Sequence, residues 1–402
     1  MQQLRILQLC NKPPLPAIDG GCIAMLNMAE GLMASGCTVK ILAIATDKHP
    51  WKPEKISREF LKQTSLDAVY IDTTVKRLPA FLSLFKSSSY NVERFYSLAF
   101  EARLVEILAR NEFDIIQLES LYVTPYISAI RRMSKAKIIL RAHNTESDIW
   151  KKNAEEEKDL FKRTWFQDLA TKLEKHERNA LNLVDVIVPI TTQDEERLKY
   201  LAGPGKNFHT STFAMRSSPV PQHGTVQEKT VFHIGAMDWK PNSDGINWLM
   251  EKVWPLVLNQ VPEAELHLAG KGMDTTQPPA VPNVFLHGEV ESAAAFMAQY
   301  KVMAVPLHSG GGIKVKVVEG MFAGKPIVTT PVGAEGIAFT QGVDLHVVSA
   351  PGEFAEKLIA LLKDDTLARE SGMNAQKTAA EHHELIRVTE KLCDFYRTIL
   401  TQ

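Results

Sequence analysis

Short apolar runs alternate with longer amphipathic stretches along the chain. The run at 4–10 leads into a Pro- and Gly-rich loop at 11–21 and then into a helical pattern of apolar positions that ends near Gly36. A second apolar run follows at 38–46. Because glycine commonly ends a helix, this order predicts a strand, a helix and a second strand. Such a unit indicates that the chain opens with a parallel sheet.

The alternation continues on both sides of one interruption. Between 203 and 229 the chain carries many turn-forming glycines and prolines, which is typical of a domain boundary. We predict one domain at 1–205 and another at 206–384, with a last helix at 385–402 that returns to the first domain. The fold class is α/β: two Rossmann-like, doubly wound parallel-sheet domains that face a cleft. The predicted strands lie at 4–10, 38–46, 68–71, 115–118, 137–141 and 186–189, and then at 230–234, 265–269, 284–286, 302–306, 327–330 and 345–348.

Composition and charge narrow the class of protein. The chain has 402 residues, 45% of them hydrophobic, with 46 Lys and Arg against 47 Asp and Glu. This near-neutral balance argues against nucleic-acid binding, and the length suits two cores. The four cysteines form no metal-ligand spacing, and no apolar run reaches the roughly 18 residues of a membrane span. We expect a cytoplasmic protein in a reducing compartment.

Loops that follow the strands are the candidate sites, because ligands of open parallel sheets bind beyond the carboxyl ends of the strands. The first such loop contains Asp19, Gly20 and Gly21, directly before a predicted helix. Glycines admit a ligand close to the backbone, and the free N–H groups of a helix N-terminus attract phosphate. This loop is therefore predicted to contact a phosphate or another anion. The alternative is a tight strand-to-helix turn without a ligand.

A second loop follows the predicted strand at 137–141. It contains His143, Asn144 and Glu146. An imidazole at this edge can position a hydroxyl or polarise a leaving group. A structural histidine is the alternative for His143, and Asn144 and Glu146 could instead cap the next helix.

A third loop, at 232–245, contains Gly235, Lys240 and Asn242. Lys240 could reach a diphosphate as a point charge. An exposed lysine next to a proline is, alternatively, simply solvated.

The fourth loop combines glycines, cations and a carboxylate at the start of a predicted helix. Its residues are Gly310, Gly311, Gly312, Ile313, Lys314, Lys316 and Glu319. Bare backbone N–H groups, the helix dipole and a lysine together suit a phosphate group. Glu319, three residues after Lys316 on the same helical face, is placed to accept hydrogen bonds from sugar hydroxyls.

Several segments together resemble the retaining nucleotide-sugar glycosyltransferases of family 4, also called glycosyl transferases group 1, which have the GT-B fold. The segments are DGG at 19–21, RAHNTE at 141–146, HIGAMDWKPN at 233–242, LAGKG at 268–272, LHGEV at 286–290 and SGGGIKVKVVEGMFAGKPIVTTPVGAEG at 309–336. The resemblance implies transfer of a sugar from a nucleoside-diphosphate sugar to a saccharide or lipid-linked acceptor, as in bacterial cell-surface polysaccharide or glycoconjugate synthesis. It implies neither a metal nor a cofactor.

The resemblance also implies roles for particular residues. The catalytic set would be His143, Lys316 and Glu319, with Glu319 holding the donor ribose. The donor-binding set would add Gly235, Lys240, Asn242, Lys271, Gly310, Gly311, Gly312, Ile313 and Lys314. The set that contacts the acceptor or a phosphate would be Asp19, Gly20, Gly21, Asn144 and Glu146. Two positions depart from the family pattern: Gly311 stands where the first of two paired glutamates is usual, and Ala236 stands where an arginine is usual.

Three alternatives accompany this interpretation. A segment at 77–96 is apolar and cationic, which could bring the protein to a membrane surface at its inner face, or could be a helix packed on its own domain. The two departures motivate a non-catalytic, sugar-nucleotide-binding scaffold protein of GT-B fold. An epimerase or phosphorylase of GT-B fold is the third alternative, although no lysine context for a pyridoxal cofactor is identifiable.

Overall fold

The computed structural model describes residues 3–74, 89–217, 226–276 and 281–401, and the chain divides into two compact units. The first unit comprises Met1–Met215 and Leu385–Gln402, and the second comprises Arg216–Glu384. The boundary therefore lies after Met215 instead of after residue 205. The reason is that the chain adds one more short strand, Asn207–Phe208, to the first sheet before it leaves this unit.

A parallel sheet forms the centre of the first unit. Within the described residues it has seven strands in the order β3-β2-β1-β4-β5-β6-β7, and all neighbours run parallel. The strands are β1 (Arg5–Cys10), β2 (Thr38–Ala45), β3 (Asp67–Tyr70), β4 (Ile115–Glu119), β5 (Lys137–Ala142), β6 (Val186–Pro189) and β7 (Asn207–Phe208). This order, which reverses direction between β1 and β4, is that of a doubly wound fold, as predicted.

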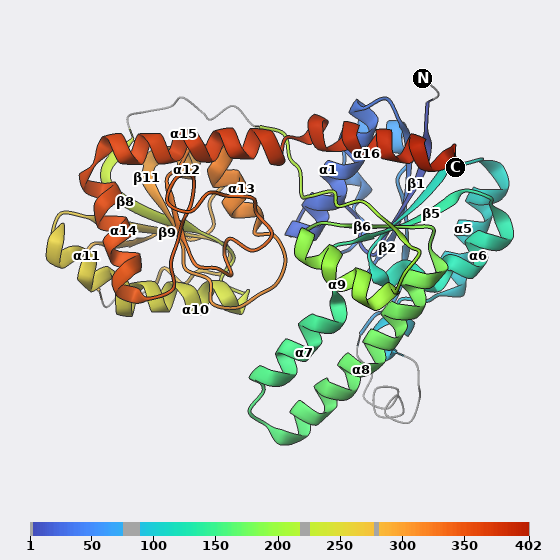
Figure 1. Cartoon of the computed structure of the whole chain (residues 1–402), viewed down its shortest axis with the longest axis horizontal. Helices are drawn as coiled ribbons and strands as arrows, with labels where there is room; N and C mark the ends of the chain where they lie inside the picture. The colour runs from blue at the N-terminus through green and yellow to red at the C-terminus, as the bar shows by residue number, and fades with distance from the viewer. Residues whose placement is uncertain (1–2, 75–88, 218–225, 277–280, 402) are drawn as a thin grey trace. The chain divides into compact units, whose positions relative to one another are not determined.

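Helices cover both faces of this sheet (Figure 1). One core contains Leu7 and Leu9 of β1 with Phe100 and Leu104 from the helix Leu98–Arg110, and the other contains Ile6 with residues of the first and last helices. The helices are α1 (Gly20–Ala34), η1 (Pro53–Lys55), α2 (Arg58–Thr64), α4 (Tyr90–Glu93), α5 (Leu98–Arg110), η2 (Leu121–Tyr126), α6 (Ile127–Met133), α7 (Glu146–Glu156), α8 (Leu160–Leu183), α9 (Thr192–Ala202) and α16 (Leu385–Leu400).

The last helix, α16, belongs to the first unit, which confirms the predicted return of the chain. It lies against α1, where Gly31 leaves room for Thr389: a Cβ atom on Gly31 would lie 2.4 Å from Cγ2 of Thr389. The hydroxyls of Ser35 and Thr389 are 3.0 Å apart and join the same two helices. Close packing of these two helices thus fixes α16 to this unit.

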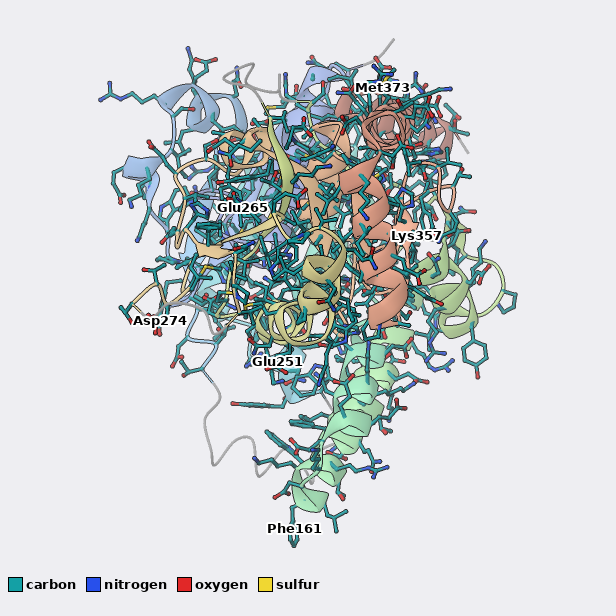
Figure 2. All side chains as sticks on the ribbon, turned by 90° about the vertical axis from the view of Figure 1, so that its left-hand side faces the viewer. Phe161, Glu251, Glu265, Asp274, Lys357 and Met373 are labelled. Carbon is teal, nitrogen blue, oxygen red and sulfur yellow. The ribbon has the colours of Figure 1, made fainter. Side chains whose placement is uncertain are left out.

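A helical hairpin of α7 and α8 projects from the first unit (Figure 1). Phe161 lies at its far end, where its side chain points into solvent (Figure 2). Trp150 and Phe166 pack edge to face, with ring centroids 5.4 Å apart, and so join the two arms.

The second unit contains a six-stranded parallel sheet within the described residues, in the order β10-β9-β8-β11-β12-β13. Its strands are β8 (Gln227–Ile234), β9 (Glu265–Ala269), β10 (Val284–Leu286), β11 (Tyr300–Val305), β12 (Ile327–Thr329) and β13 (His346–Val347). Its helices are α10 (Lys240–Trp248), η3 (Leu249–Val253), α11 (Trp254–Gln260), α12 (Ala293–Gln299), α13 (Val315–Phe322), α14 (Pro351–Lys363) and α15 (Asp365–His382). The strand order again matches a doubly wound fold.

The segment that could contact a membrane is only partly described. Residues 77–88 lie outside the described residues, and the remainder contains the short helix α4. Across the parts of the chain that the structure describes, no helix combines the length and the apolar character that crossing a bilayer requires.

Candidate functional site

The candidate site of the second unit is centred on Lys316, in the first turn of α13. Its ammonium lies 2.7 Å from Oδ1 of Asn242 on α10 and 3.2 Å from Nε2 of His233 at the end of β8. The loops after β8 and β11 bring these elements together, because β8 and β11 are neighbours in the sheet. The structure therefore joins the third and fourth predicted loops around one cation.

The partners of Lys316 are fixed as acceptors. Nδ1 of His233 lies 2.8 Å from the carbonyl oxygen of Ala304, which can only accept, so Nδ1 carries the hydrogen and Nε2 faces Lys316 as an acceptor. Burial keeps the pKa of His233 well below its usual value, so the ring is neutral. Likewise Nδ2 of Asn242 donates to the carbonyl of Ala236 at 2.8 Å, which turns Oδ1 toward Lys316.

Burial of Lys316 lowers the pKa of its ammonium to about 7, although Glu319 opposes this shift. Glu319 lies one turn further along α13, and burial raises the pKa of its carboxyl while Lys316 lowers it. Among the described residues no side chain hydrogen-bonds the carboxylate of Glu319. Both side chains are half-buried. A half-buried cation that retains a donor and a half-buried carboxylate without a partner both suit a polar ligand.

Two glycines make room at this site. A Cβ atom on Gly235 would lie 2.2 Å from Nζ of Lys316, so this position must lack a side chain for the lysine to reach its partners. Gly310 has a φ of +98°, and a Cβ atom there would lie 2.7 Å from the Trp239 ring. Gly311 is exposed, whereas Gly312 and Ile313 are half-buried beside it. The predicted glycine loop therefore leads directly to the start of α13.

Three other lysines of the predicted donor set point elsewhere. The ammonium of Lys314 is buried, donates to the carbonyl of Gly312 and lies 3.1 Å from the Glu335 carboxylate, so it holds the glycine loop together. Lys240 is exposed and pairs with Asp244 on the surface of α10. Lys271 is exposed in the loop after β9, and its carbonyl accepts the N–H of Met237. Of these predicted cations, only Lys316 lies with Asn242 and Glu319.

In the first unit, Asp19 organises the start of α1. Its side chain accepts the N–H of Cys22 at 2.9 Å, the Lys12 ammonium at 2.8 Å and Nε2 of His49 at 2.8 Å. Burial alone would raise the pKa of Asp19, but the bonds from His49 and Lys12 hold it well below its usual range. Gly20 and Gly21 open α1, as predicted, and the Lys12 ammonium lies over Gly21. Lys12 and His49 were not predicted from the sequence as partners of Asp19.

Three metal-ligating side chains meet at this place. Ligand atoms of Asp19, Cys22 and His49 lie within 4.8 Å of one another in the described part of the chain. However, the Lys12 ammonium already contacts the carboxylate of Asp19, and burial raises the pKa of the Cys22 thiol to about 11. A cation next to the carboxylate and a protonated thiol do not suit a metal ion.

His143 is held by a buried carboxylate that the sequence analysis also missed. Its Nε2 lies 2.7 Å from Oε2 of Glu119, and the same oxygen accepts Nη1 of Arg141 at 3.1 Å. Burial lowers the pKa of His143, an effect that Glu119 partly offsets. Glu119 ends β4 and His143 follows β5, so the two lie at the same carboxyl edge of the sheet.

Glu146 is the first residue of α7, shortly after β5. Tyr122 donates to its carboxylate at 2.9 Å, Asn144 also hydrogen-bonds it, and burial raises its pKa. The alternative that Asn144 or Glu146 caps the next helix is wrong, because Thr145 occupies the N-cap position of α7 and no side chain there makes a cap hydrogen bond. Instead, Glu177 of α8 accepts the N–H of Glu146 at 3.0 Å and the hydroxyl of Ser147 at 2.6 Å.

The fold of the two units is similar to that of several solved protein structures. The structure resembles the sucrose-phosphate synthase of Thermosynechococcus elongatus with a TM-score of 0.72, at 15% identity and complete coverage of both chains. It also resembles Anabaena HepE in complex with UDP and glucose, with a TM-score of 0.64, 14% identity and coverage of 98% and 99%. The chain therefore has the GT-B fold that these glycosyltransferases share, as predicted.

Curated relatives and a family model show what this chain is similar to in sequence. A Klebsiella pneumoniae protein described as an uncharacterised 44.6 kDa protein in the cps region is 22% identical and aligns over 96% of this chain and 97% of its own length. The phosphatidyl-myo-inositol mannosyltransferase of Mycobacterium leprae is 27% identical over 49% of this chain and 53% of its own length. Residues 228–364 match the family of glycosyl transferases group 1. The matched segment lies within the second unit, in a chain whose fold is GT-B.

Proposed function

We propose that this protein transfers a sugar from a nucleoside-diphosphate sugar to a saccharide or lipid-linked acceptor, as a hexosyltransferase that retains the anomeric configuration. The second unit binds the donor and the first unit binds the acceptor. The observation that carries the proposal is the group of Lys316, Asn242 and Glu319 beside a glycine loop, within the segment that matches the family.

The proposed chemistry needs stabilisation of a departing diphosphate. The bond between the anomeric carbon and the diphosphate oxygen breaks, the acceptor hydroxyl oxygen bonds to that carbon on the same face, and its proton passes to the departing phosphate. Lys316 is the cation that neutralises the developing charge, together with backbone N–H groups at the start of α13. A site of this kind needs no metal and no cofactor, and we propose that the reaction uses neither.

Glu319 is proposed to accept hydrogen bonds from the donor ribose, because its carboxylate is half-buried, close to Lys316 and without a partner among the described residues. Gly235, Gly310, Gly311, Gly312 and Ile313 would line the diphosphate and sugar. In the first unit, His143 and the start of α1 would contact the acceptor or the transferred sugar.

The relatives support the class of donor and the setting. One solved neighbour binds UDP and glucose, one relative is named a mannosyltransferase, and another is encoded in a cps region. We propose that the protein works in the cytoplasm, also at the inner face of the membrane when its acceptor is lipid-linked, and contributes to cell-surface polysaccharide or glycoconjugate synthesis.

The direct experiment is incubation with a panel of UDP-, GDP- and ADP-sugars, with measurement of binding and of nucleoside diphosphate release. We expect one donor to bind and to release its nucleotide slowly, and faster with a suitable acceptor. His143→Ala should slow transfer with little effect on donor affinity. The anomeric configuration of the product, read by NMR, tests retention, and unchanged activity in EDTA tests metal independence.

The same experiment separates an enzyme from a scaffold. Gly311 and Ala236 lack the carboxylate and the cation that the family usually has, which is the reason to consider a protein that only binds a sugar nucleotide. Donor binding without nucleotide release, unchanged by any acceptor, would favour the scaffold and refute the proposed transfer.

A further inference from the structure

Four polar residues lie on a sheet face of the first unit that is otherwise apolar. Gln8 of β1, Gln117 and Glu119 of β4 and Arg141 of β5 are all buried. Side chains two apart along a strand share a face, so Gln8 lies on the face of Ile6 and Cys10, toward α1 and α16. The register pairs Gln8 with Gln117 and Cys10 with Glu119. A buried polar group is costly unless it is fully hydrogen-bonded.

The hydrogen bonds of this group converge on Glu119. Oε1 accepts Nε2 of Gln8 at 2.9 Å and also Nε2 of Gln117, and Oε2 accepts Arg141 at 3.1 Å and His143 at 2.7 Å. The hydroxyl of Tyr396 on α16 donates to Oε1 of Gln117 at 2.6 Å, which turns the amide nitrogen of Gln117 toward Glu119. Four donors therefore surround one carboxylate.

Glu119 is ionised and can only accept hydrogen bonds. Burial alone would raise its pKa, but Arg141 and the bond from His143 lower it to about 2. Because a carboxylate has no hydrogen to give, Nε2 of His143 must carry the hydrogen of that bond. Burial lowers the pKa of His143, so the ring is neutral near pH 7.5 and its Nδ1 has a free lone pair. No hydrogen bond reaches Nδ1 from any residue that the structure describes.

We propose that Glu119 is a positioning residue that fixes the Nε2–H form of His143, so that Nδ1 accepts the hydrogen of a sugar hydroxyl. This inference rests on the proposed function and narrows it. His143 would bind an uncharged hydroxyl of the acceptor or of the transferred sugar, and would not donate to the departing diphosphate. The two roles left open for this histidine by the sequence are thereby separated.

The first test measures the histidine itself and needs no substrate. Ring-labelled ¹³C,¹⁵N-histidine is incorporated into deuterated protein, and the signal of His143, one of 12 histidines, is assigned by its loss in His143→Gln. We expect the ring shifts of the neutral Nε2–H form at pH 7.5. A neutral Nδ1–H ring or a charged imidazolium in the unsubstituted protein would overturn the proposal.

The second test compares two carboxylates of the same strand region. Asp114 stands just before β4 at the opposite edge of the sheet, where its carboxylate accepts hydrogen bonds from Arg5. We expect Glu119→Gln to lower kcat by roughly 10–100-fold, by analogy with the carboxylate partners of metal-bound histidines, with little change in the donor KM. Asp114→Asn should retain kcat within about twofold. Glu119→Asp keeps the charge and should restore part of the loss.

The outcomes distinguish this inference from the proposed function. A fixed Nε2–H form without transfer from any sugar nucleotide would leave the positioning by Glu119 intact and refute the transfer reaction. Full activity in Glu119→Gln, or an unchanged Nε2–H form in that variant, would refute the role of Glu119 although transfer occurs. If the substituted proteins do not fold, the ring form in the unsubstituted protein still decides.

Discussion

The ammonium of Lys316 lies 2.7 Å from Oδ1 of Asn242, and this contact joins α13 to α10 at the carboxyl edge of the second sheet. The other partner, His233, is neutral and supplies no negative charge. The pKa of a half-buried cation held by neutral acceptors is lowered, but the cation stays available to an anionic ligand, which provides the compensating charge.

Diphosphate binding should weaken as the pH rises above 7. Burial lowers the pKa of Lys316 to about 7, so in the free protein its charge is present below this pH and lost above it. Only the charged form attracts a diphosphate, so Kd should rise up to about tenfold per pH unit between 7 and 9. Titration calorimetry with UDP measures this slope. Lys316→Arg, which stays charged, is the control, and an equally flat profile for both proteins would contradict the prediction.

Glu319→Ala should weaken binding of a nucleoside diphosphate by about 10–100-fold, because hydrogen bonds to a charged group contribute roughly 1.5–3 kcal/mol. Binding of inorganic diphosphate should change little, since it lacks the ribose. Glu353→Ala, an exposed position on α14, is the matched control. Equal loss of both ligands in Glu319→Ala would assign this carboxylate to the diphosphate region instead of the ribose.

Gly235→Ala should impair donor binding without unfolding the unit. The added Cβ atom would lie 2.2 Å from Nζ of Lys316 and 2.7 Å from Nδ2 of Asn242, so the flexible lysine must move away from its partners. Gly352→Ala is the control, because it meets no atom within 4 Å at the start of α14. It should keep full affinity and gain up to about 1 kcal/mol of stability. Unchanged UDP affinity in Gly235→Ala would show that the position of Lys316 does not matter.

Much of the fold could be predicted from the sequence because both sheets are parallel and buried. Parallel strands covered on both faces form short continuous apolar runs, such as that of β1, and turn residues bound them clearly. β7 was missed because two residues are too few to show the alternation or the apolar run of a strand. The pairing of α7 with α8 in a hairpin was not predicted, because a projecting hairpin buries few side chains of α7 and the apolar pattern of this helix is weak.

The candidate site could be predicted less completely, for two physical reasons. The direction of a lysine side chain is not readable from its position: Lys314 and Lys316 are two residues apart, yet one holds the glycine loop and the other faces Asn242. Glu119 was missed because it ends an apolar strand. The sequence nevertheless indicates its role, since Gln117 and Glu119 are two residues apart and so share one face of a buried strand.

Tyr396→Phe should destabilise the first unit. The substitution leaves Oε1 of Gln117 buried without its donor, and an unsatisfied buried acceptor costs about 1–3 kcal/mol. Differential scanning calorimetry should show a lower Tm. Tyr200→Phe, at an exposed position of α9, is the matched control and should leave Tm unchanged. Equal Tm values for both variants would mean that this bond adds nothing to the attachment of α16.

The carboxyl of Glu177 should lower the free energy of unfolding of the first unit at alkaline pH. Burial raises the pKa of its carboxyl from 4.5 to about 7, so the folded state favours the protonated form. This contribution to stability is fully present below about pH 4.5 and is lost as the pH rises through 7, a difference of about 3 kcal/mol. Glu177→Gln is neutral at every pH. Relative to the unsubstituted protein, the variant should therefore gain stability between pH 5.5 and pH 8.5 in urea unfolding.

Glu54→Gln, an exposed control, should show the same difference from the unsubstituted protein at both pH values. A constant difference for Glu177→Gln as well would show that its carboxyl titrates normally in the folded state.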